Sequence, residues 1–135
     1  MFSKKHSKPQ TQIDSLIGAG TTIEGNLNFS GGLRIDGRVN GNVIAQQGKP
    51  STLVLSEHAC VAGEVNVTHL VINGAINGPV FVSDYLELQG KAKVNGDVHY
   101  TTMEIQLGAI VEGRLVHTSA EAQEKVVAVK SNSGD

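Results

Sequence analysis

A glycine-centred motif recurs through most of this chain and limits it to folds built from one repeated unit. The motif has the form apolar-x-Gly-x-apolar, and it occurs eight times within residues 23–115. Taking one glycine per cycle gives a mean step of about 18 residues, through Gly25, Gly41, Gly63, Gly78, Gly96 and Gly113. A regular period of this length predicts a solenoid, in which each unit packs only against its neighbours.

Each cycle is expected to consist of short β-strands. Apolar residues alternate around the glycines, as in Leu86-Glu87-Leu88, which is the two-residue period of a strand. A cycle of about 18 residues fits one rung of a β-helix with three short faces, and residues 14–117 leave room for about six rungs. The longest step, from Gly41 to Gly63, contains residues 46–50, which we expect to form a surface loop. The motif glycine fits either a corner with positive φ or a strand site where backbones crowd.

Composition agrees with a narrow solenoid core. Only 39% of the residues are apolar and 4% are aromatic, whereas 16 are glycine, and short rungs enclose little interior. The predicted fold is therefore an all-β, single-domain parallel β-helix at residues 14–117. We expect a disordered basic tail at residues 1–13 and a disordered tail at residues 118–135. The second tail holds one apolar island, Val126-Val127-Ala128-Val129, which could cap the last rung or bind a partner.

Charge and cysteine content limit the partners and the compartment. The formal charge is +3 in residues 1–13, −4 in residues 14–117 and −1 in residues 118–135. An acidic body argues against nucleic acid as a partner. The lone cysteine, Cys60, rules out an intramolecular disulfide and is expected as a small buried group in a reducing compartment. Since neither a transmembrane stretch nor a signal-peptide core is evident, we expect the protein in the cytoplasm.

Three segments of the repeat resemble the bactofilin domain. They are Gly20-Thr21-Thr22-Ile23-Glu24-Gly25-Asn26-Leu27, the run from Leu33-Arg34-Ile35-Asp36-Gly37 to Val43, and Ala92-Lys93-Val94-Asn95-Gly96-Asp97-Val98. The resemblance covers residues 14–117. It implies a right-handed β-helix that is not an enzyme, needs no cofactor, and polymerises without nucleotide into non-polar filaments. It also implies a scaffold for cell-wall enzymes such as peptidoglycan synthases or hydrolases, for cell shape, for polarity or for chromosome positioning.

The first residues are similar to the membrane-targeting peptide of many bactofilins, which implies that Met1, Phe2, Lys4 and Lys5 attach the protein to the inner face of the cytoplasmic membrane. Burying the Phe2 ring is worth about 2 kcal/mol, and each lysine adds about 1 kcal/mol against anionic lipid. One copy would bind weakly, but a filament presents many copies and gains avidity. The alternative is a solvated tail.

The two ends of a solenoid leave inward-facing residues bare on one side and backbone groups unpaired. We expect these ends to form like-with-like polymer contacts, which the resemblance also implies. The predicted interface residues are Leu16, Ile17, Ile23 and Leu27 at the N-terminal end, and Leu107, Val111, Leu115 and Val116 at the C-terminal end. The alternative is that they only complete the core and that the tails cover them.

Residues for catalysis or metal binding are not evident in the sequence. The five histidines lack the short ligand spacings of known motifs, and neither a catalytic triad nor a phosphate-binding loop is recognisable. His99 and His117, one expected cycle apart, are predicted to stack on adjacent rungs as a surface ladder rather than as a metal site. No catalytic, cofactor-binding or metal residue is therefore predicted.

Two other classes of protein remain as alternatives. Ile17-Gly18-x-x-Thr21 mimics the repeat of a left-handed hexapeptide acyltransferase or carbonic anhydrase relative, but the phase is lost at Phe29-Ser30-Gly31-Gly32. A monomeric, passive β-helix would carry polar capping elements on its ends. A screen of thermal stability against acyl-CoA and zinc discriminates the first alternative.

Overall fold

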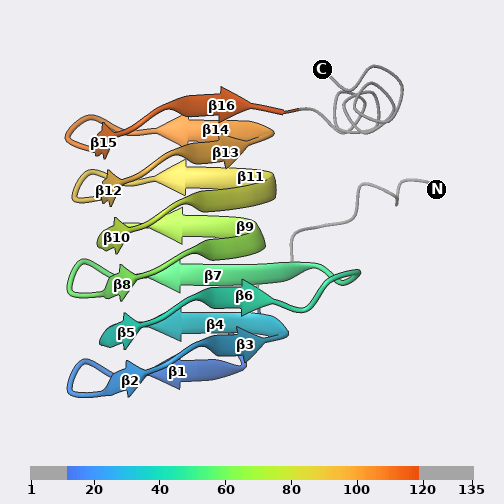
Figure 1. The fold of residues 1–135 in the computed structure, drawn as a ribbon, viewed down its shortest axis with the longest axis vertical. Coiled ribbons are helices and arrows are strands. Elements are labelled where there is room, and N and C mark those ends of the chain that lie inside the picture. Colours follow the sequence, from blue (N-terminus) through green and yellow to red (C-terminus); the bar gives the residue numbers. More distant parts are fainter. Residues whose placement is uncertain (1–11, 119–135) are drawn as a thin grey trace.

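The computed structural model describes residues 12–118, and these form a stack of short parallel strands with no helix. The strands lie in six rungs stacked along the long axis, with the N-terminal rung at one end and the C-terminal rung at the other (Figure 1). The predicted all-β solenoid is confirmed, whereas its right-handed winding stays a prediction. Of the two expected tails, all but Gln12, Ile13 and Thr118 lies outside the described residues.

Each rung has three faces, and each face is a ladder of parallel strands. Face 1 contains β1 (Ser15–Ile17), β4 (Gly31–Ile35), β7 (Ser51–Leu55), the second half of β9 (Val65–Ile72), the second half of β11 (Val80–Leu88) and β14 (Thr102–Ile105). Face 2 contains β2 (Thr22–Glu24), β5 (Arg38–Asn40), β8 (Cys60–Ala62), β10 (Ala75–Asn77), β12 (Lys93–Asn95) and β15 (Ile110–Glu112). Face 3 contains β3 (Leu27–Phe29), β6 (Val43–Ala45), the first halves of β9 and β11, β13 (Val98–Tyr100) and β16 (Leu115–His117).

Six of the eight motif glycines stack at the corner between faces 2 and 3, whereas Gly37 and Gly74 lie at the corner between faces 1 and 2. Gly78 has φ +153°, and a Cβ placed on it would lie 2.2 Å from the carbonyl oxygen of Gly63 in the rung before. A Cβ added to Gly41 would likewise lie 2.1 Å from the carbonyl oxygen of Gly25. Both explanations left open by the sequence therefore hold, since the site is a corner and the backbones also crowd there.

Polar side chains next to these glycines satisfy the backbone where the ladders break. The Oδ1 of Asn26 accepts a hydrogen bond from the Asn42 N–H at 2.9 Å, and Asn42 accepts one in turn from the Glu64 N–H at 2.9 Å. Between the last two rungs, Asp97 accepts a hydrogen bond from the N–H of Arg114 at 2.9 Å, and this bond holds the pKa of the Asp97 carboxyl below its usual value. Corner N–H groups that lack a strand partner are paired in this way.

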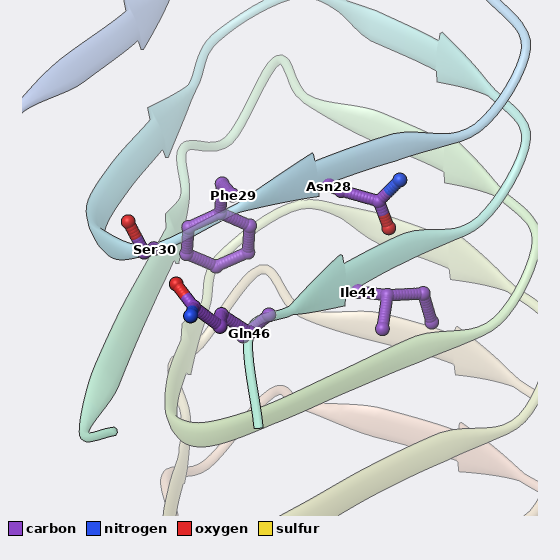
Figure 2. A pocket seen from close by; sticks show the side chains of 6 residues that line it. Asn28, Phe29, Ser30, Ile44 and Gln46 are labelled. Carbon is purple, nitrogen blue, oxygen red and sulfur yellow. The ribbon is translucent and has the colours of Figure 1, made fainter. Parts of the chain in front are cut away.

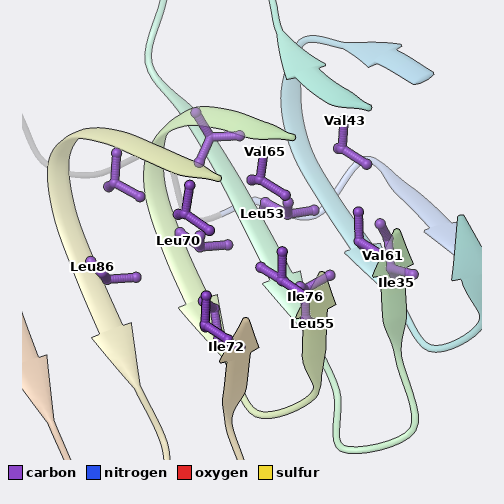
Figure 3. Packing of buried hydrophobic residues seen from close by; sticks show 14 of the residues in the cluster. Ile35, Val43, Leu53, Leu55, Val61, Val65, Leu70, Ile72, Ile76 and Leu86 are labelled. Carbon is purple, nitrogen blue, oxygen red and sulfur yellow. The ribbon is translucent and has the colours of Figure 1, made fainter. Parts of the chain in front are cut away.

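The core is built from columns of like residues, one above another. Face 1 contributes the larger side chains, such as the column Leu53, Leu70 and Leu86, whereas faces 2 and 3 contribute mostly valine (Figure 3). Most of these side chains are fully buried. The intervening Val54 and Glu87 point outward in the same ladder, which confirms the expected alternation. Because each rung encloses so few side chains, a low apolar content is enough.

The predicted insertion is a surface loop. Residues 46–50 connect β6 to β7, are all exposed, and project sideways from the stack (Figure 1). The loop is closed by Ser51, the first residue of β7, and Thr68, which lies between the two halves of β9. Thr68 Oγ1 donates to the Ser51 carbonyl at 2.6 Å and accepts from the Ser51 N–H at 2.6 Å. The longest step of the repeat thus leaves the stacking of the rungs intact.

Candidate functional site

The two ends of the rod carry unpaired strand edges. In the described residues β1, β2 and β3 pair only with the second rung. At the opposite end β14, β15 and β16 pair only with the fifth rung. Each end therefore offers three strands whose outer N–H and C=O groups can accept another strand.

At the N-terminal end, the strand register separates the predicted residues into two sets. Ile17, Ile23 and Leu27 stand below the buried Ile35, Val39 and Val43, so they point inward and close the bottom of the core.

Placing Leu16 in the inward set is wrong. It pairs with the outward-facing Arg34 and is 60% exposed, because a strand turns neighbouring residues to opposite faces. Phe29, which pairs with buried Ala45, belongs to the inward set and was missed.

At the C-terminal end, Val111 and Leu115 point inward over Val94 and Val98, as expected. The prediction that Val116 and Leu107 also point inward is wrong. Val116 pairs with His99 on the outer side, and Leu107 lies in the corner after β14, where it is 98% exposed.

Met103 and Ile105 are the inward residues of β14, over Leu86 and Leu88. The sequence carried a signal for them, since Met103-Glu104-Ile105 repeats the pattern of Leu86-Glu87-Leu88 one rung earlier.

The C-terminal end exposes more apolar surface than the N-terminal end. Ile105, Leu107, Ile110 and Leu115 are each at least 45% exposed there. Among the large apolar residues of the other end, Ile13 and Leu16 reach 41% and 60%. Large apolar groups that gather at an unpaired strand edge are unusual on a solvent-facing surface, so this end is a candidate contact surface.

The histidines do not form the predicted ladder. His99 pairs with Val116 and stacks on the Phe81 ring at 4.6 Å, whereas His117 pairs with Tyr100, whose ring lies 5.5 Å away. The local repeat is one residue shorter than a histidine ladder needs, so the two histidines fall on opposite faces of their sheet. In residues 12–118 no group of three or more His, Cys, Asp or Glu side chains could hold a metal ion.

Cys60 is half-buried rather than buried. It lies on the outer side of face 2, where the Nη1 of Arg38 is 3.6 Å from its Sγ. The prediction of a core position is wrong because Val61, not Cys60, is the inward residue of β8.

The membrane-targeting residues Met1, Phe2, Lys4 and Lys5 lie outside the described residues. The described chain starts at the side of the rod, where the Gln12 carbonyl occupies the space that a Gly32 side chain would need. None of the described residues belongs to a helix long and apolar enough to span a membrane.

A rod of stacked parallel rungs with an open, apolar edge at each end defines the class of parallel β-helices suited to self-association. The family model named Bactofilin, described as polymer-forming cytoskeletal, matches residues 15–116, and the chain belongs to this family. Bactofilin BacP of Myxococcus xanthus (strain DK1622) is 24% identical over 116 residues, which cover 85% of this chain and 47% of that protein. The chain thus spans about half the length of this relative. No solved structure shows a significant match.

Proposed function

We propose that this protein is a cytoskeletal scaffold whose β-helices join end to end into non-polar filaments. The observation that carries the proposal is the pair of unpaired strand edges with exposed apolar residues around them. The family description as polymer-forming supports it. In a like-with-like contact, the same surface of two molecules comes together. N-terminal ends therefore join N-terminal ends, and C-terminal ends join C-terminal ends. Such a contact uses no nucleotide, cofactor or catalysis.

Leu115→Arg tests the C-terminal contact. Leu115 is inward-facing yet 45% exposed, so an arginine there would place a charge in a desolvated contact at a cost of several kcal/mol. We expect at most dimers joined through the other end. Ala62→Arg is the matched control, because it adds the same charge to an exposed position in the middle of face 2 and should leave long polymers.

Analytical ultracentrifugation gives the size of the assemblies, and circular dichroism checks that both variants keep their β-structure. Long polymers of folded Leu115→Arg protein would show that the contact lies elsewhere. If that variant is unfolded, Leu115→Gln replaces it in the same comparison.

We further propose that the filament lies on the inner face of the cytoplasmic membrane, attached through Phe2, Lys4 and Lys5. Support comes from Gln12, the first described residue, whose carbonyl lies beside Gly32 of the second rung and not at the strand edge of the first rung. Phe2→Ala should weaken the free energy of membrane binding by about 2 kcal/mol per copy. Because a filament binds through many copies, the loss for the polymer should be larger. Co-sedimentation with anionic vesicles measures the loss, with Gln10→Ala as control. A Phe2→Ala polymer that pellets as well as the parent would contradict the attachment.

The proposed partners are further copies of the chain, anionic lipid, and cell-wall enzymes such as peptidoglycan synthases or hydrolases. The fold of the competing hexapeptide enzymes is also a β-helix, so their exclusion needs an experiment. We expect neither acyl-CoA nor zinc to raise the melting temperature. A rise with either one would favour the enzyme class.

A further inference from the structure

The three faces of the rod differ in the side chains that they turn outward. Face 1 carries Arg34, Glu87 and Glu104 in its outward row, and face 2 carries Arg38 and Lys93. The outward row of face 3 contains no Lys, Arg, Asp or Glu within the described rungs. This row consists of Asn28, Ile44, Asn66, Phe81, His99 and Val116.

This uncharged face is hollowed along its length. Ile44 lines a hollow of about 450 Å³ together with Asn28, Phe29, Ser30, Ala45 and Gln46 (Figure 2). Phe81 and His99 line a second hollow of about 240 Å³. A smaller hollow beneath the β6–β7 loop shares Gln46 with the first and Asn66 with the second. The three hollows therefore lie next to one another along the rod, and we call them together the face 3 groove.

The described chain ends inside this groove. The N–H of Thr118 donates to the Tyr100 carbonyl at 2.7 Å, and Thr118 lines the hollow beside Phe81 and His99. The apolar island at residues 126–129 begins eight residues further on. Eight extended residues reach about 26 Å, whereas the four steps from the sixth rung to the second measure about 19 Å. The island can therefore reach the hollow around Ile44.

We propose that Val126-Val127-Ala128-Val129 binds in the face 3 groove of its own molecule. An apolar side chain of the island can contact Ile44, Phe81 and Val116, and Lys49 of the β6–β7 loop is the one Lys, Arg, Asp or Glu that lines the three hollows. The island is the one run of four apolar residues in the sequence beyond Thr118. Binding along the side of the rod leaves both strand edges free. The island then competes with any other apolar peptide for the groove.

Thiol labelling measures whether the groove is covered. In a Cys60→Ser background, Ile44→Cys places a thiol in the groove, and Val71→Cys places one in the outward row of face 1. We expect Val127→Asp to speed maleimide labelling of Ile44→Cys about tenfold, which corresponds to a groove occupied about nine-tenths of the time. Labelling of Val71→Cys should not change. Ser131→Asp adds the same charge outside the island and should leave both rates as they were.

Three results would overturn the proposal. Equal labelling of Ile44→Cys with and without Val127→Asp would show that the island does not cover the groove. Protection that grows with protein concentration would assign the groove to a second copy. Protection of Leu115→Cys in place of Ile44→Cys would mean that the island caps the C-terminal end. Sedimentation of the same samples reports polymerisation separately, so failure of the scaffold proposal is a distinguishable result.

Discussion

At the scale of single residues, the missing Cβ of glycine decides whether successive rungs can stack at the corner of faces 2 and 3. The carbonyl oxygen of each glycine lies where the next glycine would carry a side chain. No side-chain rotation relieves such a clash, because the opposing atom belongs to the backbone of the neighbouring corner. This explains why glycine, and not another small residue, stands at the six motif centres of this corner. At Gly37 and Gly74, on the corner of faces 1 and 2, an added Cβ would instead meet the carbonyl oxygens of Thr21 and Ser56.

Gly78→Ala should therefore lower the free energy of unfolding by about 3 kcal/mol, from the clash with the Gly63 oxygen and the strain at φ +153°. Gly20→Ala is the matched control, because nothing lies within 4 Å of its added Cβ and its φ is not unusual. Urea denaturation measures both variants. If Gly78→Ala and Gly20→Ala had the same free energy of unfolding, the explanation that glycine is needed where the corners stack would be contradicted.

A second residue-scale prediction concerns pH. The hydroxyl of Tyr85 donates to Glu104 Oε1 at 2.6 Å, and this bond raises the pKa of Tyr85 from 10.0 to about 12. Since the folded pKa lies above the unfolded one, the bond contributes fully below pH 10 and its contribution is lost as the pH rises through about 12.

Absorbance titration of a Tyr100→Phe protein should show Tyr85 ionising late, and Glu104→Gln should move that ionisation toward the ordinary value. An unchanged titration in the Glu104→Gln protein would contradict the assigned cause.

At the scale of elements, the corners rather than the strands set the length of each rung. The strands of faces 2 and 3 span about three residues in every rung, and the β6–β7 loop absorbs the extra residues of the longest cycle. The polar pair that closes this loop, Ser51 and Thr68, keeps β7 and β9 in register.

Thr68→Val should cost about 2 kcal/mol, because it keeps the side-chain shape but leaves the Ser51 backbone groups unpaired. Thr101→Val removes one exposed bond to the Ser83 carbonyl and should change stability by less than about 0.5 kcal/mol. Thermal unfolding, followed by circular dichroism, measures the stability of both variants. If the two variants lose similar stability, the hydrogen bonds between Ser51 and Thr68 contribute no more than an exposed surface bond.

At the scale of the whole molecule, strand pairing within residues 12–118 is continuous along the rod and leaves the outer strands of both end rungs unpaired on one side. Association along the axis needs only strand edges and apolar side chains, and no group of metal ligands occurs in residues 12–118. We therefore expect filaments to persist after exhaustive treatment with EDTA and apyrase, as seen by negative-stain electron microscopy. Loss of filaments that ATP or a cation restores would contradict nucleotide-free and metal-free assembly.

The sequence by itself determined the repeat, the number of rungs and the insertion, because each depends on periods that are local along the chain. The steps between the motif glycines equal the rung-to-rung registers of face 3, including the longest one, from Val43 to Val65. Which side chains point inward at the ends required the tertiary structure.

Leu16, Val116 and Leu107 are as apolar as Ile17 and Leu115, so hydrophobicity alone cannot assign them. Only the pairing of Leu16 with Arg34 and of Val116 with His99 shows that they face outward. The histidine ladder failed for the same reason, since a repeat that is one residue shorter than expected turns a side chain to the opposite face of the sheet.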